Sequence, residues 1–162
     1  MVMTRTEAED VLFHEAELLD AWELMDWAAM YTPDSLYEVT SPACADPYGA
    51  DAANTLFLIS DKYDRITGRA KRLMKKTAHA EYPHSKTRHM VSNVRVTGGE
   101  GDETKCRANF AVFRTKEDNS TIYMGEAFFT IAGSGTDARI LHKRCVLDLN
   151  SLYNQGRLTI IL

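Results

Sequence analysis

The hydrophobic pattern of this 162-residue chain changes its period around residue 80, and this change limits the folds that are open to it. Before that point, apolar residues recur at the three- and four-residue steps of amphipathic helices. After it, they alternate within four segments, 89–97, 105–115, 121–132 and 139–149, which are separated by turn-forming residues. Helices followed by a strand meander predict an α+β fold, with N-terminal helices packed on one face of a curved antiparallel sheet.

The first predicted helix spans residues 6–29. Thr6 and Glu9 form a capping box at its start, and only Glu15 interrupts its apolar face. A turn at 32–34 ends this helix, and residues 35–40 are a short strand candidate.

A second helix is expected after a loop at 41–54. Residues 56–59 fit either a strand or the first turn of this helix, because a short apolar run has no decisive period. Ser60 or Asp61 can cap the helix, which ends near residue 76. Four cationic side chains form a basic stripe along it: Arg65, Arg69, Arg72 and Lys76.

The composition is that of one globular domain covering residues 1–162. With 44% hydrophobic and 26% charged residues, it excludes a disordered chain and a disulfide-dense miniprotein. A net charge of −4 argues against a nucleic-acid binder, and no apolar run is long enough for a membrane span. Three cysteines without CxxC spacing favour reduced thiols, and the acidic N-terminus fits neither a secretory signal nor a transit peptide. We therefore expect a cytoplasmic protein.

The charge is unevenly distributed along the chain. Residues 1–60 hold twelve acidic residues and one basic residue, whereas residues 61–96 hold ten basic and three acidic residues. Residues 97–162 are neutral, with eight of each. Either these are solvated faces of a monomer, or acidic and basic faces meet on different subunits, where complementary charge sets the orientation.

The sequence contains no motif typical of metal binding, nucleotide binding or nucleophilic catalysis. HExxH, GxxxxGK[ST] and GxSxG are absent, and no histidine pair has the spacing of a zinc site. A curved sheet wrapped by helices nevertheless forms a cone, in which a small isomerase or dehydratase can hold a carboxylate–histidine pair. The candidates for this free-standing cavity enzyme are Asp20, Asp26, His89, His142 and Asp148.

The segment 85–96, with the sequence SKTRHMVSNVRV, resembles the S-[RK]-T-R-H-x-[VI]-[ST]-N-[VI] signature of the β (small) subunit of aromatic-ring-hydroxylating dioxygenases. Four further segments are similar to patterns of the same family in the same order. They are EAELLD at 15–20 with Trp27, DKY at 61–63 with the helix that follows, KRCVLD at 143–148 and LTIIL at 158–162.

The resemblance implies a cystatin-like α+β cone of the nuclear-transport-factor-2 type, which agrees with the predicted fold. It also implies a mainly structural subunit without catalytic, cofactor-binding or metal-binding residues, assembled with an α subunit, typically as α₃β₃. In this family the α subunit carries the Rieske [2Fe–2S] cluster and the mononuclear Fe(II), and it converts an arene and O₂ to a cis-dihydrodiol in aromatic catabolism. A reductase, sometimes with a ferredoxin, supplies electrons from NAD(P)H.

Side chains with several hydrogen-bond donors, in the signature segment and in the basic helix before it, are candidates for subunit contacts. Arginine in particular pairs with carboxylates in a fixed geometry and is enriched at interfaces. The interface candidates are Arg69, Arg72, Arg88, His89, Asn93 and Arg95. Two alternatives to the subunit remain open: the free-standing cavity enzyme, and a ligand-binding or dimerisation module of the same fold.

Overall fold

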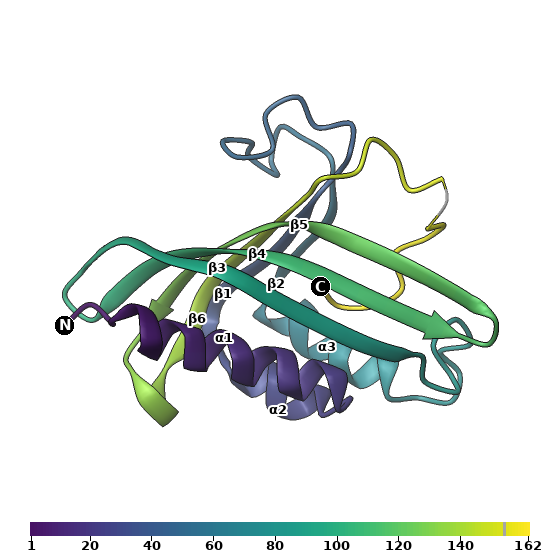
Figure 1. The fold of residues 1–162 in the computed structure, drawn as a ribbon, viewed down its shortest axis with the longest axis horizontal. Helices are drawn as coiled ribbons and strands as arrows, with labels where there is room; N and C mark the ends of the chain where they lie inside the picture. Colours follow the sequence, from purple (N-terminus) through teal and green to yellow (C-terminus); the bar gives the residue numbers. More distant parts are fainter. Residues whose placement is uncertain (154) are drawn as a thin grey trace.

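The computed structural model describes residues 1–153 and 155–162 (Figure 1). Helices α1 (Arg5–Asp20) and α2 (Leu24–Ala29) precede strand β1 (Tyr31–Thr40), and strand β2 (Phe57–Lys62) leads into helix α3 (Tyr63–Leu73). The second half holds four strands and a short 3₁₀ turn, η1: β3 (Lys86–Glu100), β4 (Glu103–Lys116), β5 (Asn119–Ala132), η1 (Gly135–Asp137) and β6 (Arg139–Leu147).

The six strands form one sheet in the order β2-β1-β6-β5-β4-β3. All neighbours are antiparallel except β1 and β6, which run parallel, so the sheet is mixed rather than purely antiparallel as predicted. The sheet curves around the three helices, which lie on the same side of it (Figure 1). The predicted α+β cone is therefore confirmed, and its interior lies between the helices and the concave face of the sheet.

The single first helix predicted over residues 6–29 is wrong, because the chain breaks at Trp22. This residue has a positive φ of 57°, and its indole N–H donates to the Ser85 carbonyl oxygen at 3.0 Å while its ring stacks on His84. The capping box is also two residues earlier than predicted. Thr4 and Glu7, which have the same spacing as Thr6 and Glu9, cap each other's main-chain N–H groups.

Three further predictions, in the region of β1, β2 and α3, differ from the structure. β1 already begins at Tyr31, and Pro33 lies within it where the pairing with β6 is interrupted, so the strand loses no ladder bond there. Residues 56–59 belong to a strand from residue 57 on, and Ser60 and Asp61 lie in that strand rather than capping a helix. Helix α3 begins at Tyr63 without a side-chain cap and ends at Leu73, before residue 76.

The strand faces follow the predicted alternation. On β4 the side chains of Cys106, Ala108, Phe110 and Val112 are buried against the helices. On β5, Ile122 and Met124 point away from that core and are 43% and 48% exposed. In the described part of the chain, no helix is long and apolar enough to cross a membrane.

Candidate functional site

A buried ion pair crosses the interior of the cone. Glu15 of α1 accepts two hydrogen bonds of 2.9 Å from the Lys143 ammonium of β6. The Trp27 indole and the Tyr31 hydroxyl also donate to Glu15, at 3.1 and 3.2 Å. Both charges are thus paired and hydrogen-bonded, which is the condition under which burial of an ion pair is tolerated.

The C-terminal segment of the chain fills the rest of the interior. Ile160, Ile161 and Leu162 are each at most 3% exposed. Lys143 donates to a main-chain oxygen of Leu162 at 2.7 Å, and the Leu162 N–H donates to the Tyr37 hydroxyl at 3.2 Å. A residual cavity of about 30 Å³ remains beside Leu162, which is room for about two water molecules.

A second carboxylate contact, between Asp20 and His89, lies at the C-terminal end of α1, where the helix meets β3. The Asp20 carboxylate is 2.6 Å from Nδ1 of His89, whose side chain is 7% exposed, and Nε2 of His89 is 2.8 Å from the Ile161 carbonyl oxygen. The two ring nitrogens therefore face oxygen atoms of two different elements, α1 and the C-terminal segment. Burial raises the pKa of Asp20, but hydrogen bonds from His89 and Thr87 outweigh it and hold this pKa below its ordinary value.

Burial keeps the cysteine thiols and tyrosine hydroxyls of the interior neutral by raising their pKa values. It raises the pKa of Cys145 to about 11 and, with the Glu15 carboxylate nearby, that of Cys106 to about 12. The pKa of Tyr31 is raised by burial and by Glu15, and that of Tyr37 by burial and by Cys145. None of these groups has the lowered pKa of an activated nucleophile.

The residues of the cavity-enzyme alternative do not converge. Asp20 and His89 lie together, but His142 lies on the outer face of β6, where its Nε2 is 2.6 Å from Glu38. Asp148 is exposed after β6, and Asp26 lines a groove outside the cone. Only Asp20 and His89 form a pair. The second ring nitrogen of His89, Nε2, contacts the C-terminal segment, so the pair presents no open site to a substrate.

The predicted interface residues fall into two groups. His89 is internal, and Arg69 is held by Asp61, with Nη2 at 2.7 Å from the carboxylate. The other four are exposed: Arg72, Arg88, Asn93 and Arg95. Asn93 has a φ of 53° at a bulge in β3, where the pairing with β4 shifts between Ser92 and Arg95, and it accepts a hydrogen bond from the Arg95 guanidinium.

The outer face of the sheet carries an apolar patch. In register across β3, β4 and β5, Arg88, Phe113 and Ile122 form one row, and Met90, Ala111 and Met124 form the next. We call these six residues the outer patch. Met90 is 57% exposed and Phe113 is 44% exposed. A contiguous group of large exposed apolar side chains is typical of a protein contact surface.

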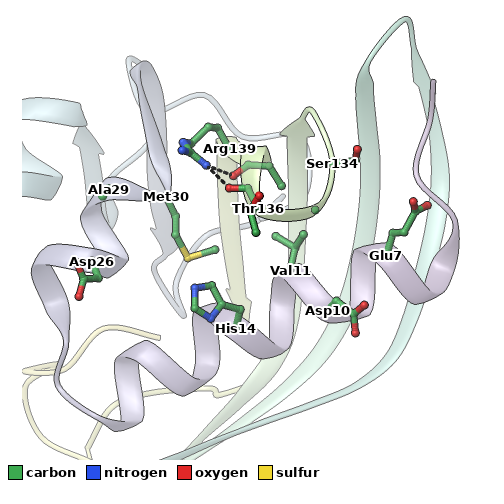
Figure 2. Close-up of a pocket in the computed structure, with 12 residues that line it drawn as sticks. Glu7, Asp10, Val11, His14, Asp26, Ala29, Met30, Ser134, Thr136 and Arg139 are labelled. Atoms are coloured by element: carbon green, nitrogen blue, oxygen red, sulfur yellow. Dashed lines mark hydrogen bonds between the residues drawn. The ribbon is translucent and has the colours of Figure 1, made fainter.

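Two open grooves lie on the helical side. One, of about 610 Å³, lies between α1, α2 and the turn after β5. Met30, Val11 and His14 meet in its middle, Glu7 and Asp10 lie on one side and Asp26 on the other, and Arg139 also lines it (Figure 2). The other, of about 630 Å³, runs along α3 and is lined by Arg69, Arg72, His79 and Arg157. The rim of the first groove therefore carries three carboxylates and the Arg139 guanidinium and is acidic on balance, whereas cationic side chains outnumber Glu81 in the second groove, which is basic on balance.

Sequence reasoning missed the partners of the interior charges. Glu15 was visible as the only polar residue on the apolar face of the first helix, but no local pattern marks Lys143 or the segment at 160–162 as its neighbours. Glu81 was also missed; it is buried and binds Arg114, Ser85 and Thr159. Among the described residues, no group of three histidine, cysteine or acidic side chains is placed to hold a metal ion.

Comparisons with known proteins agree with this geometry. Residues 14–154 match the family described as "Ring hydroxylating beta subunit". The small oxygenase component of the p-cumate 2,3-dioxygenase system of Pseudomonas putida is 46% identical over 160 residues, which are 99% of this chain and 88% of the relative.

Solved structures show the same fold. A chain of naphthalene 1,2-dioxygenase with indole bound is similar with a TM-score of 0.81 and 15% identity, over 98% of this chain and 85% of that one. A nuclear-transport-factor-2-like protein with a cystatin-like fold, from Novosphingobium aromaticivorans, has a TM-score of 0.62 and 17% identity, over 95% and 88% of the two chains. Both the cystatin-like fold and the family resemblance are thereby confirmed: the chain belongs to the ring-hydroxylating dioxygenase β-subunit family and is the small oxygenase component of a multicomponent aromatic dioxygenase.

Proposed function

We propose that this chain is a structural subunit that supplies no catalytic residue and holds no cofactor. The observation that carries this proposal is the filled interior. In a cone enzyme the interior would hold the substrate, but here Ile160, Ile161 and Leu162 occupy it and bond to the polar groups that could otherwise act on a ligand. The Rieske [2Fe–2S] cluster and the mononuclear Fe(II) then belong to the α subunit, which a component of a dioxygenase system implies as its partner.

The α subunit, which holds the iron centres, then carries out the reaction of the assembled enzyme. The α subunit adds both atoms of O₂ to an aromatic ring and forms a cis-dihydrodiol, with electrons from NAD(P)H delivered in the cytoplasm by a reductase or ferredoxin. Because the curated relative is named for p-cumate, we propose an aromatic carboxylate of that type as the substrate of the complex.

The outer patch is the surface proposed for the α subunit. Its four large side chains, Met90, Phe113, Ile122 and Met124, are between 43% and 57% exposed, and they lie on three adjacent strands. The Arg88 side chain lies at the edge of the patch, 3.9 Å from the Asp20 carboxylate, but it is 75% exposed, so its guanidinium can also bind a carboxylate of the partner. An apolar centre with arginine at its border is the usual composition of a stable interface.

The two grooves are the surfaces proposed for contacts between β subunits. A threefold ring needs two different, complementary patches on every copy, because each copy presents one patch to each neighbour. The acidic rim at Glu7, Asp10 and Asp26 and the basic groove with Arg72 and Arg157 supply such a pair. We propose on this basis a β trimer within an α₃β₃ hetero-hexamer.

Co-expression of this chain with a large oxygenase subunit tests the proposal. We expect both chains to co-purify, with the mass of three copies of each by light scattering. Met124→Asp places a charge in the outer patch and should abolish co-purification, whereas Phe13→Asp, at a comparably exposed position on α1, should leave it intact. Failure of the two unmodified chains to associate would contradict the proposed function.

A further inference from the structure

A third open groove lies on the outer face of the sheet, beside the outer patch. Its volume is about 420 Å³, and Met90, Ala111 and Met124 of the patch also line it. Polar and aromatic side chains form the rest of the groove, and those that matter here are Tyr48, Arg107, Glu126 and Asp148. We call it the outer groove. Because the patch and the groove are continuous, a protein that covers the patch also reaches the groove.

The loop between β1 and β2, residues 41–56, forms one wall of the outer groove through Tyr48, and it extends away from the helices (Figure 1). The Arg144 guanidinium of β6 donates to the Tyr48 carbonyl oxygen at 3.0 Å, and the Tyr48 ring meets the Phe128 ring edge-on, with the centroids 5.7 Å apart. The other hydrogen bonds of the loop in the described structure join its residues to each other. Tyr48 therefore attaches the loop to the sheet.

Arg144 is itself held by a buried carboxylate. Its Nε donates to Glu38 at 2.9 Å, and Nε2 of His142 lies 2.6 Å from the same oxygen. Glu38 is only 2% exposed, and the Arg144 guanidinium also lies over the Phe57 ring, 5.2 Å from its centroid. The charge of Arg144 is thus compensated within the subunit, and toward the outer groove this residue positions Tyr48.

The charged side chains of the outer groove leave one carboxylate without a cationic partner. Arg107 of β4 binds Glu126 of β5, and Arg95 lies opposite Arg107 on β3. Asp148, the first residue after β6, is exposed, and in the described part of the chain no salt bridge reaches its carboxylate. Its main-chain N–H donates to the Met124 carbonyl oxygen at 2.9 Å, which keeps it at the border of the outer patch. The uncompensated negative charge therefore lies on the β6 side of the groove.

These groups suit a guanidinium or ammonium group on a side chain of a partner. The Asp148 carboxylate offers a charge-assisted hydrogen bond, and the Tyr48 ring, in a residue that is 58% exposed, offers a face for a cation. Met90 and Met124 offer an apolar surface for the aliphatic stem of such a side chain. Arginine with contacts of these kinds is a typical anchor of a protein interface. An anionic side chain on this side of the groove would be repelled by Asp148.

We propose that the outer groove is a socket for a positively charged side chain of the large oxygenase subunit, which binds between Asp148 and the Tyr48 ring. The inference rests on the proposed function, in which the outer patch binds that subunit. It adds the orientation of the partner: Arg88 lies at one end of the patch and Asp148 at the other. Opposite charges at the two ends of an apolar surface favour one orientation of the bound protein.

Subunit exchange in the assembled complex tests the proposal. The complex of the large subunit with each variant is mixed with a tenfold excess of the unmodified chain labelled with ¹⁵N, and mass spectrometry follows the replacement of the variant. We expect Asp148→Lys either to give no complex or to exchange at least about tenfold faster than the unmodified chain, because like charges then meet in the socket. Asp148→Glu keeps the charge and should exchange at the unmodified rate. Glu17→Lys makes the same change of charge on α1, where its side chain is 79% exposed, and should also leave the rate unchanged.

Tyr48 is tested by a matched pair of variants and by proteolysis. Tyr48→Ala removes the ring but keeps the carbonyl oxygen that Arg144 binds, and it should speed exchange about three- to tenfold. Tyr153→Ala, at a residue that is 90% exposed after β6, should have no effect. Chymotrypsin should cut the isolated chain after Tyr48, and the complex should be protected there because the partner covers the socket. Equal cutting in both would overturn the proposal.

The outcomes separate the socket from the proposed function. Unchanged exchange of Asp148→Lys, when Met124→Asp still prevents assembly, would overturn the socket and leave the outer patch as the binding surface. The Tm of the isolated Asp148→Lys chain should stay within about 2 °C of the unmodified value, which shows that a loss of assembly is not a loss of folding. If that variant does not fold, Asp148→Asn removes the charge alone and should speed exchange about threefold, and an unchanged rate would then overturn the proposal.

Discussion

Asp20, the last residue of α1, binds His89 of β3 at two points: it accepts from the main-chain N–H at 3.0 Å and contacts the ring Nδ1 at 2.6 Å. The same carboxylate accepts from the Thr87 hydroxyl at 3.0 Å. One side chain thus fixes the end of the first helix to the first strand of the meander, and it orients the imidazole toward the Ile161 carbonyl oxygen.

Asp20→Asn should lower the free energy of unfolding by about 1–3 kcal/mol, because it removes the charge from a carboxylate that accepts hydrogen bonds from the Thr87 hydroxyl and the His89 main chain and contacts the His89 ring. Urea unfolding followed by circular dichroism measures the change. Asp26→Asn, at an exposed position on α2, is the control and should shift the free energy by less than about 0.5 kcal/mol. Equal effects of both substitutions would contradict the role assigned to Asp20.

Stability should fall in acid. Burial raises the pKa of the Asp20, Glu38 and Glu81 carboxyls, but hydrogen bonds and cationic partners outweigh it, so all three pKa values lie below the ordinary values of 3.8 for aspartate and 4.5 for glutamate. A carboxyl with a lowered folded-state pKa stabilises the fold above its unfolded-state pKa, and this contribution is lost as the pH falls through the folded-state pKa.

The free energy of unfolding, measured in urea at several pH values, should therefore decrease as the pH drops below 4.5. Glu38→Gln, which cannot titrate, should flatten part of this decrease. A free energy that stays constant down to about pH 3 would argue against the three carboxylates as the cause.

Gly125→Ala should be strongly destabilising. A Cβ at this position on β5 would overlap with the Val146 carbonyl oxygen of β6, and main-chain atoms cannot move aside as a flexible side chain would. We expect a loss of about 3 kcal/mol or more in the free energy of unfolding. Gly68→Ala on α3 is the matched control: nothing lies within 4 Å of the added methyl group, and alanine should raise the stability by up to about 1 kcal/mol.

Thiol reactivity should distinguish the three cysteines. Burial raises the pKa of Cys145 to about 11 and that of Cys106 to about 12, so both remain protonated thiols at neutral pH. Cys44 lies half-buried in the loop between β1 and β2. A thiol reagent should therefore modify one cysteine in the native chain and all three after denaturation, and Cys44→Ser should abolish the native reaction.

The fold was largely predictable because its signals are local. Turn residues between 98 and 102 and between 133 and 136 separate the long strands, and the alternation on β4 identifies the buried face correctly. The break at Trp22 was not predictable, because it depends on a stacking contact with His84, a residue 62 positions later in the sequence. The parallel pairing of β1 with β6 likewise joins the two ends of the chain.

The interior was only partly predictable. Asp20 and His89 were among the candidates for a carboxylate–histidine pair, and they do meet. His142, drawn from the same set, lies on the opposite face, since neighbouring residues of a strand alternate and Lys143 takes the interior position. The occupation of the interior by residues 160–162 depends on the path of the chain after β6, for which the sequence carries no local pattern.

The bulge at Asn93 has a consequence for the free subunit. β3 is an edge strand of 15 residues, and a long regular edge is a template on which another copy can add a strand and begin to aggregate. The bulge and the cationic side chains of Lys86, Arg88 and Arg95 interrupt that template. These features therefore disfavour the addition of a strand from another copy at the β3 edge.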